Sequence, residues 1–439
     1  MKLFRPSEQA RRSMPRRPSV VSVLDVGSSK ICCLIARLTP NDADAAETMR
    51  ARTHTIELLG FGHQRSRGIK SGVVVNLDAA EQAIRLAVDT AERRAGVTVD
   101  SLIVNFSAGR LASETYSASV TIAGKSVEET DIGRVLMAGH RHSVSEGRSV
   151  IHALPIGYSL DTDGGIADPL GMVGQRLGVD MHMVSVDSQP AGNLELAINR
   201  CHLSLERLVA SPFASGLSAL VDDESELGCA CVDLGGGTTS MAVFMKGEFV
   251  HADAIAIGGQ HITNDIARGL STRIEDAERL KTVYGSALPH PADEREILSV
   301  QPIGDEDEPV NQVPRSALNR IIRPRVEEIL ELVRDRLNAT GFAALVGRRM
   351  VLTGGGSQLT GVVEAARRVL ARNVRIGRPL GIAGMPEVAK GPAFAAAVGL
   401  LIYPQVAKMD QIEAGGAHYA MTGTGGYFAR VGQWMRESF

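Results

Sequence analysis

Two segments of the chain share one order of apolar runs and polar turns. Residues 19–38 begin with an apolar run, pass through a Gly-Ser turn and continue with a second apolar run, which predicts a β-hairpin. Residues 227–259 repeat this order as a strand, a glycine-rich turn, a strand and further strand. Because helices follow each hairpin, the repeat predicts an internally duplicated α/β fold with two similar lobes and a cleft between them.

Helices and single strands are predicted between and after the hairpins. Apolar residues at helical spacing indicate helices at 79–95, 128–143, 189–203 and 391–403 and from 261 to about 337. Single apolar runs indicate strands at 99–108 and 205–212. Residues 348–371 are predicted to form a strand, a glycine turn and a helix. Residues 286–314 are rich in Pro, Asp and Glu and lack periodicity, so we expect a surface loop. Pro324 is expected at a helix start, where proline is tolerated.

Composition narrows the class of protein. With 439 residues, 44% of them hydrophobic, the chain can build two or three domain cores. The net charge of −3 gives no sign of nucleic-acid binding, so no nucleic-acid partner is expected. The five Cys residues are odd in number and form no CxxC pair, which argues against disulfides or zinc and fits a reducing cytoplasm. No apolar run is long enough to span a membrane.

The turn of each hairpin carries residues suited to phosphate. These are, in the first turn, Asp25, Gly27, Ser28, Ser29 and Lys30, and in the second, Asp233, Gly235, Gly236, Gly237, Thr238 and Thr239. Small residues let backbone N–H groups approach phosphate oxygens, and hydroxyl groups add donors. Asp25 and Asp233 suit Mg²⁺ held through water. One such turn is equally typical of an ordinary hairpin, but two in duplicated units favour a phosphate site.

Two further groups are candidates for the nucleoside side of the ligand. A third glycine turn follows a strand and consists of Gly354, Gly355, Gly356 and Ser357. Its backbone could lie against a base or sugar, although glycine-rich turns between strand and helix are common. Glu278 and Lys281 share one helix face and could contact ribose hydroxyls and base. Taken alone, this pair is more often a surface ion pair.

These turns, together with "GPAFAAAVGLL" (391–401), resemble the actin/Hsp70/sugar-kinase superfamily and, within it, the FtsA family of bacterial cell-division actin homologues. The motifs that carry the resemblance are 66–78, 165–174, 232–244, 277–285, 323–333 and 434–439. It implies an actin-like (ribonuclease H-like) two-lobed ATPase fold. The segments it implies are a disordered basic arm (1–19), subdomain 1A (20–100 and 186–221), an inserted subdomain 1C (101–185), subdomain 2A (222–266 and 341–403, returning to 1A), subdomain 2B (267–340), a flexible linker (404–426) and an amphipathic membrane-targeting helix (427–439).

The resemblance also implies a function. A member of this family binds ATP with Mg²⁺, polymerises into filaments of its own kind, and binds the FtsZ C-terminal tail through subdomain 2B. It acts on the cytoplasmic face of the inner membrane at the division septum, with membrane lipids and other division proteins as partners. Many superfamily members have an acidic residue where Ser211 stands, so we expect a slow ATPase at most and assign no catalytic residue. A small-molecule kinase or another ATPase of the superfamily is the alternative.

Basic residues and the C-terminus supply candidate contact surfaces. Arg320, Arg323, Arg325 and Arg334 lie on one predicted helical segment and could receive an acidic peptide, an ordinary solvated helix face being the even alternative. As a helix, the tail collects Tyr427, Phe428, Val431, Trp434, Met435 and Phe439 on one apolar stripe, flanked by Arg430 and Arg436. Arginine and tryptophan both suit a lipid interface. Docking on a protein is the alternative for the tail.

Overall fold

A computed structural model describes residues 18–41, 52–108, 110–142, 144–304 and 309–407. The first lobe contains a five-stranded sheet in the order β11-β6-β1-β2-β3. The bounds of these strands are, in that order, Ser204–Ala210, Ser101–Phe106, Ser19–Val26, Lys30–Pro40 and His54–Arg65. Strands β1 and β2 form the predicted hairpin, with Asp25 opposite Cys32. Strand β6 runs parallel to both β1 and β11.

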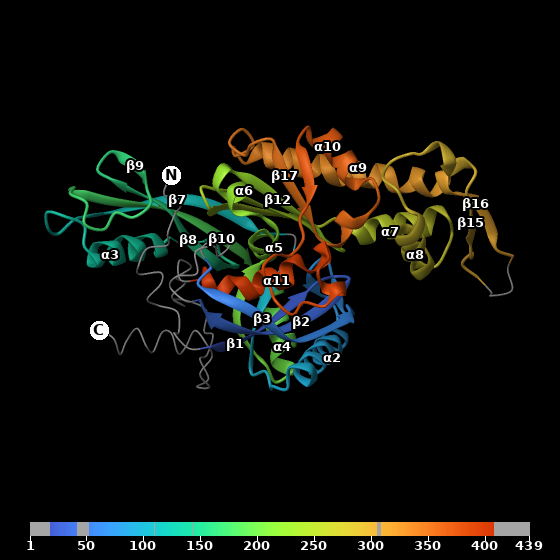
Figure 1. Cartoon of the computed structure of the whole chain (residues 1–439), viewed down its shortest axis with the longest axis horizontal. Helices are drawn as coiled ribbons and strands as arrows, with labels where there is room; N and C mark the ends of the chain where they lie inside the picture. The colour runs from blue at the N-terminus through green and yellow to red at the C-terminus, as the bar shows by residue number, and fades with distance from the viewer. Residues whose placement is uncertain (1–17, 42–51, 109, 143, 305–308, 408–439) are drawn as a thin grey trace.

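The second lobe repeats this layout with a sheet in the order β14-β13-β12-β17-β18. Its strands are, in that order, Glu248–Ile255, Thr239–Met245, Cys229–Leu234, Arg349–Thr353 and Asn373–Ile376. Strands β12, β13 and β14 are antiparallel neighbours, as are β1, β2 and β3, and β17 and β18 continue the sheet in parallel. Asp233, which lies opposite Ser240, is the counterpart of Asp25 in the first hairpin. The predicted duplication is therefore confirmed (Figure 1).

Two short apolar helices lie between the sheets (Figure 1): α5 (Ser211–Ala219) and α11 (Ala395–Ile402). All residues of both helices are buried. They cross so closely that a Cβ at Gly399 would lie 1.7 Å from the carbonyl oxygen of Ala214, and only glycine allows this approach. Their side chains join those of both sheets in one cluster, so the two lobes share a continuous core. On the other face of the first sheet pack α2 (Leu77–Ala95) and α4 (Ser188–Arg200).

An inserted unit separates β6 from α4 in the chain. It consists of a sheet in the order β7-β10-β8-β9, covered by α3. The bounds are, in that order, Ala112–Thr121, Arg176–Asp187, Arg148–Leu160, Asp163–Ile166 and, for the helix, Glu129–His140. The unit has a small core of its own around Val135 and Val179. It also contacts the second lobe, where Nδ1 of the buried His182 lies 2.8 Å from the carbonyl oxygen of Phe249 on β14.

The remaining elements surround the second lobe or form short connections. Helices α7 (Gly259–Gly269), α8 (Ile274–Tyr284), α9 (Arg315–Ala339) and α10 (Val362–Leu370) share a second hydrophobic core with the outer face of the second sheet. The short helix α6 spans Asp222–Leu227. Two short strand pairs are β4 (Ile69–Lys70) with β5 (Val73–Val74) and β15 (Ile297–Val300) with β16 (Asn311–Pro314). The 3-10 turns lie at Pro291–Glu294, Gly355–Gln358, Glu387–Ala389, Pro392–Phe394 and Tyr403–Gln405.

Two expectations from the sequence are wrong. The segment 286–314 is not a simple loop, because it contains a 3-10 turn and the β15–β16 pair, in which Leu298 and Val300 are buried. Strands of four residues are too short to show periodicity beside the surrounding Pro, Asp and Glu. Pro324 lies inside α9, where burial of neighbours such as Ile322 and Val326 outweighs the missing backbone hydrogen bond.

Candidate functional site

The two predicted phosphate-binding turns have the same backbone geometry. In the first, the N–H of Gly27 donates to the carbonyl oxygen of Lys30, and in the second, the N–H of Gly235 donates to the carbonyl oxygen of Thr238, each over 3.0 Å. Both turns follow the first strand of their lobe, β1 or β12, and precede the second. The duplicated hairpins therefore present two equivalent turns at the boundary between the lobes.

Glycine in the second turn allows the two turns to touch. A Cβ at Gly237 would lie 2.4 Å from Oγ of Ser28, and one at Gly236 would lie 2.9 Å from Cβ of Ser29. Such distances are shorter than real side-chain contacts, so any larger residue would push the lobes apart. The close approach explains the glycine run, because it brings the backbone of one lobe next to serine side chains of the other.

Two aspartates and a lysine lie beside these turns. Asp25 is buried and accepts hydrogen bonds from Nδ2 of Asn105 at 2.7 Å and from Nζ of Lys30 at 3.2 Å. Asp233 accepts a hydrogen bond from Oγ of Ser215. Burial is the main cause that raises the pKa of Asp233 to about 6; the hydrogen bond from Ser215 opposes it, and the charge of Asp25 adds to it. Burial alone would lower the pKa of Lys30, but the charge and hydrogen bond of Asp25, together with the nearby Cys32 and Asp233, outweigh burial and the pKa is raised.

The third glycine turn lies directly against the second. Gly354 has a left-handed backbone, with φ of 81°, and a Cβ there would lie 2.1 Å from Oδ1 of Asp233. Ser357 is fully buried, and its hydroxyl donates to the carbonyl oxygen of Gly354 at 2.7 Å, so it stabilises the turn. Gly356 also packs tightly, since its Cβ would lie 2.9 Å from the carbonyl oxygen of Leu234.

Glu278 and Lys281 form more than a surface ion pair. Nζ of Lys281 donates to Oε2 of Glu278 at 2.7 Å, to Oγ1 of Thr263 at 2.8 Å and to the carbonyl oxygen of Gly259 at 3.1 Å. The Lys281 side chain is only 14% exposed, whereas that of Glu278 is 51% exposed. The N–H of Gly259 in turn donates to the carbonyl oxygen of Gly235. This pair is therefore joined to the second phosphate-binding turn through the start of α7.

The structure adds site residues that the sequence analysis missed. Asn105 holds Asp25 and also accepts a hydrogen bond from the N–H of Val26 at 2.6 Å. Gln260 of α7 donates from Nε2 to the carbonyl oxygen of Ser28 at 2.9 Å and so joins the two lobes. The Gly-Gly pair before Gln260 was the available signal, because it follows a strand as the other glycine turns do. Asn105 gave none, since a lone Asn in a strand indicates no chemistry.

Some hydroxyl groups near the turns already have hydrogen-bond partners within the protein. The hydroxyl of Thr239 donates to the carbonyl oxygen of Ile257 at 2.8 Å, which makes it a structural residue of the second turn. Oγ of Ser28 accepts a hydrogen bond from the N–H of Gly72 at 3.0 Å. Ser211 is buried, and its hydroxyl accepts a hydrogen bond from Asn105 at 3.0 Å. A serine in this place orients Asn105 and cannot act as a general base, since a neutral hydroxyl is too weakly basic to accept a proton near pH 7.

The described residues contain no group of three His, Cys, Asp or Glu side chains arranged to hold a metal ion. Asp25 and Asp233 supply two carboxylates on opposite sides of the touching turns. That number is too small for a metal site made of protein ligands alone, and it suits a hydrated ion that also binds phosphate oxygens.

The four candidate arginines all lie on α9, and each has an acidic neighbour. Their partners are Glu294 for Arg320 at 3.1 Å, Glu327 for Arg323 at 3.0 Å, Asp265 for Arg325 at 2.6 Å, and Asp335 for Arg334 at 3.0 Å. Arg320 is 73% exposed, whereas Arg325 is only 27% exposed and contacts helix α7. The structure thus separates an exposed arginine face, Arg320 with Arg323, from Arg325, which ties two helices together.

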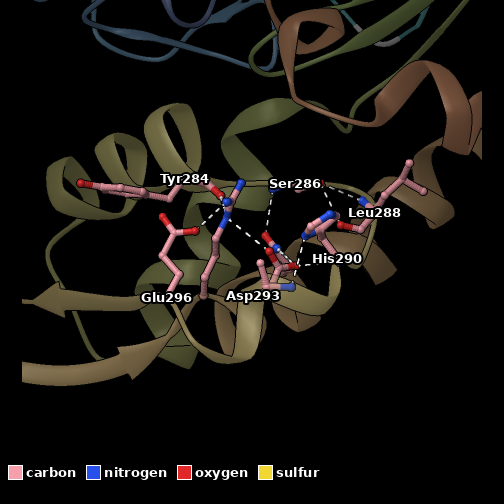
Figure 2. A network of polar contacts seen from close by, with 9 residues as sticks. Tyr284, Ser286, Leu288, His290, Asp293 and Glu296 are labelled. Atoms are coloured by element: carbon pink, nitrogen blue, oxygen red, sulfur yellow. Dashed lines mark hydrogen bonds and ion pairs between the residues drawn. The ribbon is translucent and has the colours of Figure 1, made fainter.

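A buried polar network fixes the segment beside this arginine face (Figure 2). Asp293 is 3% exposed and accepts hydrogen bonds from the N–H of His290 at 2.9 Å and from Nδ2 of Asn319 at 2.8 Å. Burial alone would raise the pKa of Asp293, but these hydrogen bonds and the nearby Arg315 outweigh it, and the pKa is lowered. Arg315 also donates to the carbonyl oxygen of Tyr284 at 2.7 Å. The network holds Glu294, the neighbour of Asp293, beside the start of α9.

The predicted membrane residues, Phe428, Arg430, Val431, Trp434, Met435, Arg436 and Phe439, lie outside the described residues, as do residues 1–17 of the predicted arm (1–19) and residues 408–426 of the predicted linker (404–426). The packed chain continues to Ala407, which is buried. Within the part of the chain that is described, no helix is long and apolar enough to cross a bilayer.

Comparison with protein families gives two matches. The family described as "Cell division protein FtsA" matches residues 230–399, and the domain described as "SHS2 domain inserted in FTSA" matches residues 108–185. The chain is 58% identical to the cell division protein FtsA of Rhizobium meliloti, over 97% of this chain and 96% of that protein. It is 34% identical to FtsA of Pseudomonas aeruginosa and 30% identical to FtsA of Escherichia coli K12, each over 95% of this chain and 97% of the relative.

Solved structures show the same fold in more distant proteins. A chain of the PilM-PilN type IV pilus biogenesis complex superposes with a TM-score of 0.58 at 16% identity, over 89% of this chain and 99% of that chain. MreB5 of Spiroplasma citri bound to ADP superposes with a TM-score of 0.51 at 13% identity, over 89% and 97%. At these identities the similarity concerns the two-lobed fold alone.

Asp233→Asn should stabilise the nucleotide-free protein in a pH-dependent way. The pKa of Asp233 rises from 3.8 to about 6 in the folded state, so the charged form disfavours folding by about 3 kcal/mol. This cost is absent below both pKa values and develops as the pH rises from 3.8 to about 6. In EDTA, the free energy of unfolding of the variant should exceed that of the wild type at about pH 8 and match it near pH 4. The exposed control Asp335→Asn should show no such trend, and an equal trend in both variants would contradict the assignment.

Proposed function

This chain belongs to the FtsA family of cell division proteins, and from that membership we propose that it binds ATP with Mg²⁺ between its two lobes, polymerises on the inner membrane and tethers FtsZ to it. The family makes it an actin-like cell division protein. The observation that best supports nucleotide binding is the convergence of three glycine turns and the Glu278–Lys281 pair at one boundary between lobes. The alternative of a small-molecule kinase receives no support from the family.

The residues present fit a nucleotide and its metal ion. Backbone N–H groups of the touching turns, from residues 28–30 and 236–238, are the donors proposed for phosphate oxygens, since those of Gly27 and Gly235 close the turns. Asp25 and Asp233 are proposed to hold Mg²⁺ through water, and the ion would neutralise charge on the phosphates and on the two carboxylates. Gly354 to Ser357 and the Glu278–Lys281 pair are proposed to hold the adenosine. ATP bound to both lobes would favour the form in which they are closed together.

Turnover is proposed to be slow. Hydrolysis requires a residue that orients a water molecule in line with the phosphate. Asn105 and Ser211 occupy the buried polar position beside Asp25, and neither side chain is an effective base near pH 7. The role of ATP would therefore be to set the conformation of the lobes and the filament rather than to drive rapid chemistry.

Lys281→Ala should lower ATP affinity about tenfold or more, because hydrogen bonds to charged groups contribute about 1.5–3 kcal/mol each. Equilibrium binding of a fluorescent ATP analogue and of ATP itself would measure this. Lys390→Ala is the matched control, since Lys390 also pairs with a glutamate three residues earlier, Glu387, but on the surface.

Turnover by the wild type on lipid should stay below about 1 s⁻¹, the low end for ordinary enzymes. Equal losses in both variants, or rapid multiple turnover, would contradict the proposal.

Subdomain 2B, proposed at residues 267–340, is where we place the FtsZ tail. Arg320 and Arg323 are the proposed contacts because they are exposed and lie one helical turn apart at the end held by the Figure 2 network. Arg320 is paired with the exposed Glu294, and Arg323 with Glu327, which also binds Arg368. Solvent-exposed pairs contribute only about 0–1 kcal/mol, so an acidic peptide could replace these contacts at little cost. Arg325 and Arg334 are proposed as weaker contributors.

The double variant Arg320→Glu and Arg323→Glu should weaken binding of an FtsZ tail peptide about tenfold, or 1.4 kcal/mol. The reason is charge reversal at an exposed surface, so the loss should shrink as ionic strength rises. Fluorescence anisotropy with a labelled tail peptide would measure it. Arg93→Glu on α2, an exposed arginine of the first lobe, is the control and should bind as the wild type does. Unchanged affinity in the double variant would remove this face from the site.

The C-terminal segment, residues 427–439, is proposed to bind membrane lipids as a weak amphipathic helix on the cytoplasmic side of the inner membrane. A single short helix of this kind binds weakly, so stable attachment would require several copies in one filament. Polymerisation would supply those copies, which joins the two proposed activities.

Trp434→Asp or Val431→Asp should release the protein from anionic liposomes while ATP binding stays intact, because each places a charge in the apolar stripe. Gln433→Asp adds the same charge on the opposite, polar face and serves as the matched control, so it should cosediment nearly as the wild type does. Sedimentation with and without ATP would also compare the full chain with one ending near Gly425. Cosedimentation that survives both charged substitutions would reject the membrane helix.

A further inference from the structure

Helix α7 begins directly on the second phosphate-binding turn. The N–H groups of Gly259 and Gln260 donate to the carbonyl oxygens of Gly235 and Gly236, over 2.9 and 2.8 Å. The first N–H groups of a helix have no partner within the helix, so these bonds satisfy them and fix the helix start. A Cβ at Gly258 would lie 2.6 Å from the carbonyl oxygen of Gly235. The turn and the first turn of α7 therefore move together.

The same end of α7 also contacts the first lobe. Nε2 of Gln260 donates to the carbonyl oxygen of Ser28, at 2.9 Å, within the first phosphate-binding turn. Ser28 is buried and is itself held by the N–H of Gly72. A change in the distance between the lobes must therefore either break this hydrogen bond or move the start of α7.

The middle of α7 contacts α9 through an ion pair. Oδ2 of Asp265 accepts from Nε of Arg325 at 2.6 Å, and Oδ1 accepts from Nη2 of Arg325 at 3.2 Å. Both side chains are about three-quarters buried, at 25% and 27% exposed. A two-point contact between carboxylate and guanidinium fixes the relative orientation of the groups as well as their distance. Arg325 lies two residues from Arg323, which belongs to the proposed FtsZ-binding face.

The packing between the two helices leaves room for a shift. A small apolar cavity lies between the start of α7, at Gly259 and Ile262, and α9, at Val326 and Ile329, and it is also lined by Gly356 of the third glycine turn. Side chains that surround a cavity lack the interlocking contacts of a filled core. Small sliding movements of packed helices are a common way in which domains respond to ligands.

We infer that α7 couples the nucleotide cleft to the partner-binding face, with Gln260 as the contact at the cleft and the Asp265–Arg325 ion pair as the contact at α9. The inference rests on the proposed function, since it assumes ATP between the turns and an acidic tail on Arg320 and Arg323. It adds a regulatory route: closure of the lobes on ATP moves α7, and the ion pair carries that movement to α9. Because binding equilibria are linked, the tail must then change ATP affinity by the same factor.

The network of Figure 2 contributes a fixed reference for this movement. Arg315 and Asn319 hold the first turns of α9 to the segment between Tyr284 and Glu296. The residues labelled in that view belong to this segment, whereas the ion pair between α7 and α9 lies later, at Arg325. A shift carried by this ion pair would therefore act on α9 one to two turns beyond the point where the helix is held.

The test measures the affinity of a labelled FtsZ tail peptide for the full chain with and without Mg-ATP. In the wild type the two dissociation constants should differ about fivefold or more, the lower end for coupled sites. Asp265→Asn should bring their ratio below about twofold, while ATP still binds. Asp335→Asn, which removes an exposed acid from α9, should keep the wild-type ratio. Gln260→Ala, which removes the contact of α7 at the nucleotide cleft, should also reduce this ratio, and Gln312→Ala at an exposed glutamine is its control.

Each outcome decides between the two proposals. A wild-type ratio near one with the peptide bound, or an unchanged ratio in Asp265→Asn, would overturn the coupling and leave FtsZ binding intact. A peptide that binds in neither state would reject the proposed FtsZ site. In that case, hydrogen exchange of the α9 amides tests the coupling alone: ATP should change their protection in the wild type and in Asp335→Asn but not in Asp265→Asn. Absence of an ATP effect on α9 in the wild type would overturn the inference.

Discussion

At the boundary between the lobes, the glycine backbone of one hairpin turn lies against serine side chains of the other, and the rest of the site depends on this contact. Gly237 and Gly236 have no side chains to keep Ser28 and Ser29 away. Once the turns touch, the third glycine turn and the start of α7 contact the second turn, and Lys281 in turn contacts the start of α7. A single added methyl group would break this arrangement at several points.

The same contact concentrates charge where water is scarce. Lys30 offsets Asp25 directly, and Asn105 adds a hydrogen bond, whereas Asp233 accepts a hydrogen bond from the hydroxyl of Ser215 and is only weakly offset by the charge of Lys30. Burial therefore dominates at Asp233 and raises its pKa to about 6. Under the proposed function, Mg²⁺ supplies the positive charge that this side of the site lacks, so the apo protein bears a cost that the bound ion removes.

The arginines of α9 differ in what their ion pairs can do. Arg320 and Arg323 are exposed, and their bonds to Glu294 and Glu327 are weak enough to exchange for an incoming carboxylate. Arg325 is mostly buried, and separating it from Asp265 would leave a charge in a poorly hydrated place, which costs more. The exposed pairs therefore suit binding of a partner peptide, and the mostly buried pair suits transmission of movement between α7 and α9.

Periodicity in the sequence was sufficient for the duplicated lobes, the hairpins and the glycine turns, because strand alternation and glycine runs are local features. It missed β15, β16 and the interior position of Pro324, because strands of four residues carry too little periodicity and because tertiary burial outweighs one lost helical bond. Asn105, Ser28 and Asp265, which pair with Asp25, Gln260 and Arg325, lie 80, 232 and 60 residues away along the chain. No local pattern records such pairings, so only the packing of the lobes and helices decided which predicted residues meet.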